Sequence, residues 1–295
     1  MNGKPDIKED EIRVIGNSSH TNDDKNNNRW FIVALVAIIA LVIAIVVLLT
    51  LTRNNDRPVD NGRGDTELNL YEGGVQPDDE WYENSDPSRG SVIDVFDTVF
   101  DGVSLRVFTP YNTKPELWVG EIDSLDKSIL LCTQAADLRR DNGKILGAFV
   151  YRGEPLAWGL SKRGYCAIID GAVTLGVSDN SPLFEYATER SGYFFRQYPL
   201  VDNGEAVMNN PENVAIRRAL CSWGDQLRII VSLDRMTMNE FSLLLSRLGV
   251  RDAIYVVGGD SVHGWYDTPE GERKYFFKVP KTIPTNISFI VFRKK

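Results

Sequence analysis

The chain has 295 residues, a formal net charge of −8 at pH 7, two histidines and three cysteines. This acidic balance, without a basic stretch interleaved with aromatic residues, argues against a nucleic-acid partner. Two histidines are too few for a zinc site of the usual type, and Cys132, Cys166 and Cys221 are too few for a disulfide framework. Their apolar neighbours predict buried thiols. The sequence indicates no metal site and leaves any cofactor unknown.

Residues 1–29 are rich in Asn, Asp and Lys. Such a segment has too little apolar surface to bury, and it predicts a disordered tail. Residues 30–51 follow as 22 residues with no charge and one hydroxyl. A helix of this length spans about 33 Å, against a hydrocarbon core of about 30 Å. The sequence therefore predicts a single transmembrane helix that contacts the lipid bilayer.

A cleaved signal peptide is the alternative interpretation of residues 30–51. The long tail of mixed charge before this segment is unlike the short basic start of a signal peptide. The apolar run also exceeds the usual length, and no small-residue cleavage site follows it. We therefore expect an uncleaved anchor.

The orientation of this anchor is not decided by the flanking charges. Lys25 and Arg29 precede the apolar run, and Arg53, Arg57 and Arg63 follow it. This count leans slightly against export of the C-terminal part. A short tail followed by one anchor and a large domain commonly has its N-terminus inside, so we expect the C-terminal domain on the exported side (periplasmic, lumenal or extracellular).

Residues 52–90 contain clustered Asn, Asp, Gly and Pro and predict a polar linker, whereas residues 91–295 have the apolar content of a single globular domain. Period-two alternation over 103–108 indicates a half-buried strand. Asp170-Gly171 between two apolar runs indicates a hairpin. Further strand-like runs occupy 117–122, 145–151, 165–169, 173–177 and 287–292.

The clearest local pattern lies between residues 227 and 257. An apolar run at 227–231 is followed by a capping box, in which Thr237 and Glu240 can satisfy each other's backbone amides. Apolar residues then recur at helical spacing up to Leu248, and Gly249 stands where a helix ends. A second apolar run at 253–257 completes a strand, helix, strand unit, which predicts parallel strands. We expect an α/β fold of mixed type with a mixed sheet containing this βαβ unit.

A glycine-rich loop follows the second strand of this unit, where ligands gather in open α/β sheets. Gly258 and Gly259 allow close approach of the backbone to an anion, and Asp260 and His263 carry groups suited to acid or base chemistry. The alternative is a tight turn in which the glycines only permit positive φ angles.

Several segments, in the same order and spacing, resemble motifs of the phosphodiester glycosidase domain family. These segments are 147–159, 198–204, 217–221, 227–231, 236–241, 248–249 and 253–261. The resemblance covers about 120 residues and implies hydrolysis of a sugar-1-phosphodiester. It implies that Arg217 pairs with the phosphate, that Gly258 and Gly259 present amides to it, and that Ser261 stands at the position of the family serine. The alternative is that Arg217 is a surface or strand-end arginine.

Two positions depart from the family pattern. Val257 stands where the family has an aspartate, and Leu146 stands where it has an asparagine. Asp260 is then the first candidate for the acid or base and His263 the second, with an exposed loop histidine as the alternative for His263. Two functions stay open: a membrane-anchored enzyme acting on sugar-1-phosphodiesters of envelope glycans, and a catalytically inactive module of the cell envelope that binds a glycan or serves as a scaffold.

Overall fold

The computed structural model describes residues 80–159, 162–259, 263–276 and 284–295. Within these ranges no helix is long and apolar enough to cross a membrane. The predicted tail, the predicted span at 30–51 and most of the predicted linker lie outside the described residues, as do Asp260 and Ser261.

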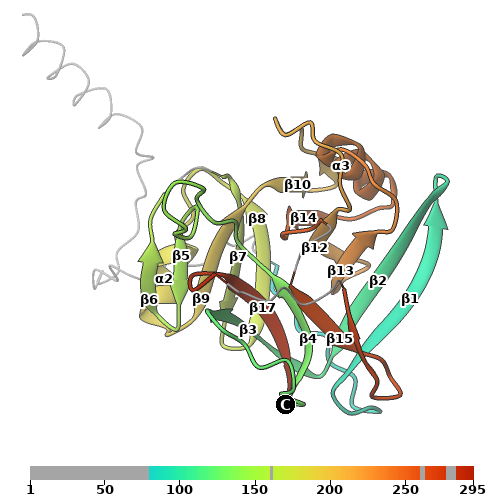
Figure 1. Ribbon diagram of the computed structural model, residues 1–295, viewed down its shortest axis with the longest axis horizontal. Helices are drawn as coiled ribbons and strands as arrows, with labels where there is room; N and C mark the ends of the chain where they lie inside the picture. The colour runs from blue at the N-terminus through green and yellow to red at the C-terminus, as the bar shows by residue number, and fades with distance from the viewer. Residues whose placement is uncertain (1–79, 160–161, 260–262, 277–283) are drawn as a thin grey trace, which may run out of the picture. The chain divides into compact units, whose positions relative to one another are not determined.

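Three antiparallel sheets make up most of the described chain (Figure 1). The first sheet has the strand order β1 (Val92–Phe100), β2 (Val103–Tyr111), β13 (Gln226–Ser232), β12 (Arg218–Trp223), β14 (Asp252–Tyr255), β10 (Pro199–Asp202) and β11 (Glu205–Ala206). The second has the order β16 (Arg273–Tyr275), β15 (Gly264–Asp267), β4 (Ile129–Gln134), β17 (Ser288–Lys294) and β3 (Thr113–Val119). The third has the order β6 (Glu154–Ala157), β5 (Phe149–Tyr151), β9 (Tyr193–Gln197), β7 (Gly164–Ile169) and β8 (Ala172–Val177).

The two helices of the described residues are short and lie on separate sheets. Helix α3 (Met238–Arg247) buries Phe241, Leu244 and Leu245 in a cluster with residues of the first sheet. Helix α2 (Leu183–Glu189) packs Leu183 and Ala187 against the third sheet. A larger apolar cluster draws residues from all three sheets and forms the centre of the domain. The domain is therefore mostly β-sheet rather than the α/β fold that the sequence predicted.

The predicted strand, helix, strand unit exists, but its sheet is not mixed. Strands β13 and β14 both pair antiparallel with β12, so they run parallel to each other with β12 between them. The β12–β13 hairpin explains this placement, because its tight turn at Gly224 and Asp225 puts β12 directly beside β13. The chain leaving α3 then pairs with the free edge of β12. The prediction of a mixed sheet is wrong for this reason.

The local signals at turns and caps are confirmed. Asp170 and Gly171 have φ angles of 51° and 87°, and they connect β7 directly to β8. The Thr237 hydroxyl accepts from the Glu240 amide at 3.2 Å, while a Glu240 carboxylate oxygen accepts from the Thr237 amide at 2.7 Å. Gly249 ends the helix with a φ angle of 84°. All three cysteines are buried free thiols.

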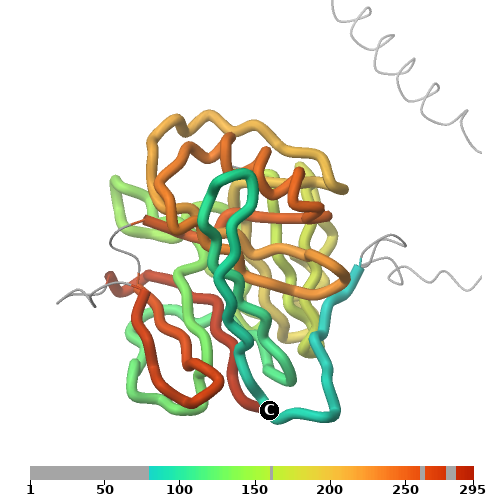
Figure 2. The backbone as a smooth tube through the Cα atoms, turned by 90° about the vertical axis from the view of Figure 1, so that its right-hand side faces the viewer, coloured from blue at the N-terminus to red at the C-terminus, as the bar shows by residue number. Residues whose placement is uncertain are grey.

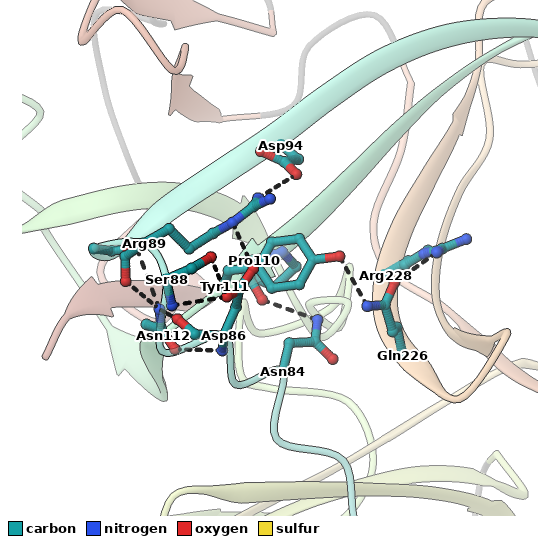
Figure 3. Close-up of polar contacts among 11 residues, drawn as sticks. Asn84, Asp86, Ser88, Arg89, Asp94, Pro110, Tyr111, Asn112, Gln226 and Arg228 are labelled. Atoms are coloured by element: carbon teal, nitrogen blue, oxygen red, sulfur yellow. Dashed lines mark hydrogen bonds and ion pairs between the residues drawn. The ribbon is translucent and has the colours of Figure 1, made fainter.

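Residues 80–90 are fastened to the first sheet, although the sequence assigned them to the linker (Figure 3). The Asn84 amide group donates to the carbonyl oxygens of Pro110 and Leu227, at 2.9 and 2.7 Å. The Asn112 side chain donates to the carbonyl of Asp86 at 2.6 Å and accepts from the Asp86 amide at 2.9 Å. Together with the antiparallel bridge between Tyr82 and Val173 of β8, these bonds hold the start of the domain in place.

Candidate functional site

A cavity of about 660 Å³ lies where several loops meet beside one edge of the first sheet. Arg217 stands directly before β12, Tyr255 ends β14, and Tyr198 joins β9 to β10. Because β12 and β14 are antiparallel, the start of one strand and the end of the other meet at the same edge. The volume lies within the usual range of small-molecule sites, about 300–1,000 Å³.

Arg217 forms the inner wall of this cavity. It is 2% exposed, and its Nε donates to the Met236 carbonyl at 3.0 Å. Its Nη2 donates to the Asn213 carbonyl, and its guanidinium carbon lies 6.0 Å from the centre of the Tyr255 ring. The side chain is thus held in place by neutral carbonyl groups, and no carboxylate among the described residues pairs with it.

The loop 137–146 forms the opposite wall. It is closed by a bridge between Leu138 and Ile145 and by the hydrogen bond from the Leu146 amide to the Asp137 carbonyl, at 2.8 Å. Leu146, at the position of the family asparagine, faces the cavity with an apolar side chain. Arg139 and Asp141 pair with each other at 3.0 Å. Arg140 also lines the cavity, and it has no ion pair among the described residues.

A buried ion pair stands behind this wall. The Lys162 ammonium, whose side chain is 1% exposed, pairs with the Asp137 carboxylate and donates to the Gln197 side-chain carbonyl at 2.6 Å. It lies 4.4 Å from the centre of the Tyr198 ring. Burial lowers the pKa of Lys162 and the charge of Asp137 opposes this shift, whereas burial raises the pKa of Tyr198. Sequence reasoning missed Lys162 and Asp137, because no motif connects residues that are 25 positions apart.

The predicted site residues are only partly brought together. Of the described ones, Arg217 lines the cavity, and His263 is not among the lining residues. His263 is 9% exposed, packs edge-on against Phe289, and has a buried Nδ1 without a hydrogen-bond partner in the described part of the chain. Burial lowers the pKa of His263.

The two glycines of the loop after β14 have different surroundings. The Gly258 amide donates to the Tyr255 hydroxyl at 2.9 Å, so it is already satisfied inside the protein. A Cβ atom at Gly258 would lie 2.8 Å from the Ile216 carbonyl oxygen, which shows how closely this loop packs on the start of β12. Gly259 has a φ angle of 109°, and no atom of the described residues beyond its chain neighbours lies within 4 Å of a Cβ atom added there. Val257 contributes its carbonyl oxygen to a hydrogen bond from Arg218, at 3.0 Å.

The positive and negative charges that line the cavity do not cancel. Asp137 is neutralised by Lys162, and Asp141 by Arg139. The guanidinium groups of Arg140 and Arg217 remain without a carboxylate partner among the described residues. Apolar atoms from Leu138, Leu146, Pro211 and Met238, with the rings of Tyr198 and Tyr255, cover the rest of the wall. The arrangement suits an anion with a less polar body attached.

Comparisons with known proteins support the fold. The sequence matches no protein-family model and no curated protein. Among solved structures, the chain is similar to the catalytic domain of zebrafish N-acetylglucosamine-1-phosphodiester alpha-N-acetylglucosaminidase, auto-inhibited by its pro-peptide, with a TM-score of 0.52 and 14% identity. The similarity covers 74% of this chain and 88% of that one. A hypothetical protein from Synechocystis matches with a TM-score of 0.46 and 12% identity, over 69% of this chain and 62% of that one. The described domain therefore has a distant structural relationship to a phosphodiester glycosidase catalytic domain.

Proposed function

We propose that the domain binds a sugar-1-phosphodiester in the cavity of Arg217. The observation that carries the proposal is the charge of this cavity, in which Arg140 and Arg217 have no carboxylate partner among the described residues. A guanidinium group matches the oxygens of a phosphodiester with paired hydrogen bonds. The fold shared with a sugar-phosphodiester hydrolase supports the same ligand class.

The sugar would lie against the aromatic and aliphatic part of the wall. Tyr198 and Tyr255 offer ring faces as well as hydroxyl groups, and Leu146 and Met238 offer apolar surface. Rings of this kind combine apolar contact with a polar handle, which suits the mixed surface of a sugar. Leu146 in place of the family asparagine makes this part of the wall less polar, and this favours recognition over catalysis.

A second candidate function is hydrolysis of the same ligand, and the position of Asp137 favours it. Its carboxylate lies at the cavity, is 31% exposed, and is held by the buried ammonium of Lys162. A carboxylate so placed can take a proton from water as the water oxygen bonds to the anomeric carbon, while the bond from that carbon to the phosphate oxygen breaks. Asp260 and Ser261, which lie outside the described residues, remain further candidates from the family resemblance, whereas His263 does not line this cavity and the Gly258 amide is already bonded to the Tyr255 hydroxyl.

One experiment separates binding from hydrolysis. The full-length chain, purified in detergent, is titrated with the methyl phosphodiester of N-acetylglucosamine-1-phosphate by calorimetry, and the release of free sugar is followed by chromatography. We expect saturable binding that weakens about tenfold or more in Arg217→Met, since a charged hydrogen-bonding partner is lost. Arg247→Met is the matched control, because Arg247 pairs with Asp101 on the surface. Binding that is unchanged in Arg217→Met would contradict the proposal.

The release of sugar then decides between the two functions. Turnover that is lost in Asp137→Asn or Asp260→Ala supports hydrolysis, and binding without turnover supports a recognition module.

We also propose that residues 30–51 anchor the domain to a membrane, with the domain on the exported side. The uncharged 22-residue run supports this proposal. Extraction of membranes with alkaline carbonate should leave the full-length chain in the pellet, and protease added to intact cells or vesicles should reach a C-terminal tag only from the exported side. A chain that carbonate releases would contradict the anchor.

A further inference from the structure

A second cavity, of about 250 Å³, lies on the other face of the first sheet. Arg106, Val231 and Arg218 are register partners on the neighbouring strands β2, β13 and β12, so their side chains point to the same face. All three line this cavity, together with Tyr266 of β15 and Phe276 just after β16. The cavity thus lies between the first sheet and the β15–β16 hairpin of the second.

The two arginines of this cavity differ in their partners. Arg106 pairs with Asp97, with Nε and Nη2 each 2.7 Å from a carboxylate oxygen, and its Nη1 lies 3.3 Å from the Tyr266 hydroxyl. Arg218 is 0% exposed and has no ion pair with any described residue. Its Nη1 donates to the Thr133 hydroxyl at 2.7 Å and to the Val257 carbonyl at 3.0 Å.

The remaining nitrogens of Arg218, Nε and Nη2, are buried and have no hydrogen-bond partner among the residues that the structure describes. These two atoms form one edge of the guanidinium group, and their N–H bonds are parallel. Burial lowers the pKa of Arg218 to about 10, so the group keeps its charge at neutral pH. A buried charge with two unsatisfied donors is costly unless something pairs with it.

We infer that this second cavity binds a small organic anion, a carboxylate or a phosphate monoester with an apolar body, through the Nε and Nη2 edge of Arg218. The two parallel donors match two oxygens of such an anion. Arg106 is already neutralised by Asp97, so among the described residues the cavity offers a single unpaired positive charge and suits one anionic group.

The remaining walls of the cavity fit the apolar body of the ligand. Phe108 and Tyr266 are buried, with ring centres 4.8 Å apart, and Phe276 lies 5.4 Å from Phe108. The guanidinium carbon of Arg218 is 4.2 Å from the centre of the Phe276 ring. Leu233 and Tyr275 are each about two-fifths exposed and lie at the rim.

The test uses benzoate and phenyl phosphate as probes, with benzyl alcohol as the neutral compound of similar shape. Each is titrated by calorimetry into the full-length chain in detergent, with empty detergent micelles as the blank. We expect at least one anion to bind about tenfold or more tighter than benzyl alcohol, because only an anion satisfies the charged edge. The two anions distinguish a carboxylate ligand from a phosphate ligand. Failure of both to bind, or equal binding of benzyl alcohol, overturns the inference.

Arg218→Met is the diagnostic variant and Arg247→Met its matched control. Binding of the preferred anion should weaken about tenfold or more in Arg218→Met and stay unchanged in the control. If Arg218→Met does not fold, NMR of the wild-type chain provides a second measurement. It follows the chemical shifts of the methyl groups of Ile216 and Val231, which line the cavity. The anion should shift both resonances, and a saturable binding event that leaves both in place would overturn the inference.

Discussion

Arg217 and Arg218 are neighbours in the chain, and their side chains line two different cavities on opposite faces of one sheet. Successive residues of an extended strand point to opposite sides, so Arg217 faces α3 with Ala219, while Arg218 faces the central cluster with Leu220. One strand thereby supplies a buried guanidinium group to each of two separate pockets.

The two partners of the buried ion pair should differ in their effect on stability. Asp137→Asn leaves the Lys162 ammonium, with a side chain 1% exposed, without a counter-charge, and we expect a loss of about 3 kcal/mol in the free energy of unfolding. Lys162→Met leaves a carboxylate that is 31% exposed and can be hydrated, so we expect a loss of only about 1 kcal/mol. Urea unfolding at neutral pH measures both values, and equal losses would contradict this account.

The capping box of α3 should contribute measurably to stability. Thr237→Ala removes the acceptor for the Glu240 amide and one of the two donors to the Glu240 carboxylate. We expect a loss of about 1–2 kcal/mol in the free energy of unfolding. Thr237→Ser keeps the hydroxyl and is the control, which should retain most of the wild-type value in the same urea experiment.

His263 should make the domain less stable in mild acid. Burial lowers the pKa of His263 below its ordinary value of 6.5, so the unfolded chain binds the proton more readily than the folded chain. This site therefore leaves stability unaffected above about pH 6.5 and reduces it as the pH falls from there toward the lower folded-state value. His263→Leu should remove this part of the pH dependence. Urea midpoints of the two proteins between neutral pH and pH 5 should diverge, and parallel curves would contradict the prediction.

Gly258 should tolerate no side chain without movement of the loop. The added methyl group of Gly258→Ala would lie 2.8 Å from the Ile216 carbonyl oxygen and 3.3 Å from the Arg218 amide nitrogen. Because both neighbours belong to the backbone, we expect a loss of about 1–3 kcal/mol. Gly90→Ala is the control, since nothing lies within 4 Å of the corresponding position and its φ angle is not positive. Thermal unfolding of the two variants compares them directly.

Local structure was predictable because short-range chemistry decides it. The capping box, Gly249 at the end of α3 and the Asp170-Gly171 turn each depend on residues a few positions apart. The same holds for burial of the three cysteines, which follows from their apolar neighbours. Arg217 lines a cavity, and its predicted role as a phosphate ligand stays a prediction.

Strand order and the composition of the cavities depended on long-range pairing. No local pattern in residues 227–257 indicates that β12 lies between β13 and β14. This order depends on which strands pair with the two sides of β12. Strands β1, β4 and β15 and their pairings were likewise not predicted. Residues 80–90 have the composition of a linker, yet hydrogen bonds to residues 26 and 143 positions away hold Asn84 in place.

The sequence by itself determined where the Asp170-Gly171 turn and the caps of α3 lie, because those depend on residues a few positions apart. Only the tertiary structure decided that Lys162 meets Asp137 and that Arg218 faces a cavity without an ion-pair partner among the described residues. The physical reason is that an ion pair or an unsatisfied donor depends on which strands become neighbours. That choice is made by packing of the whole domain, and no local pattern encodes it.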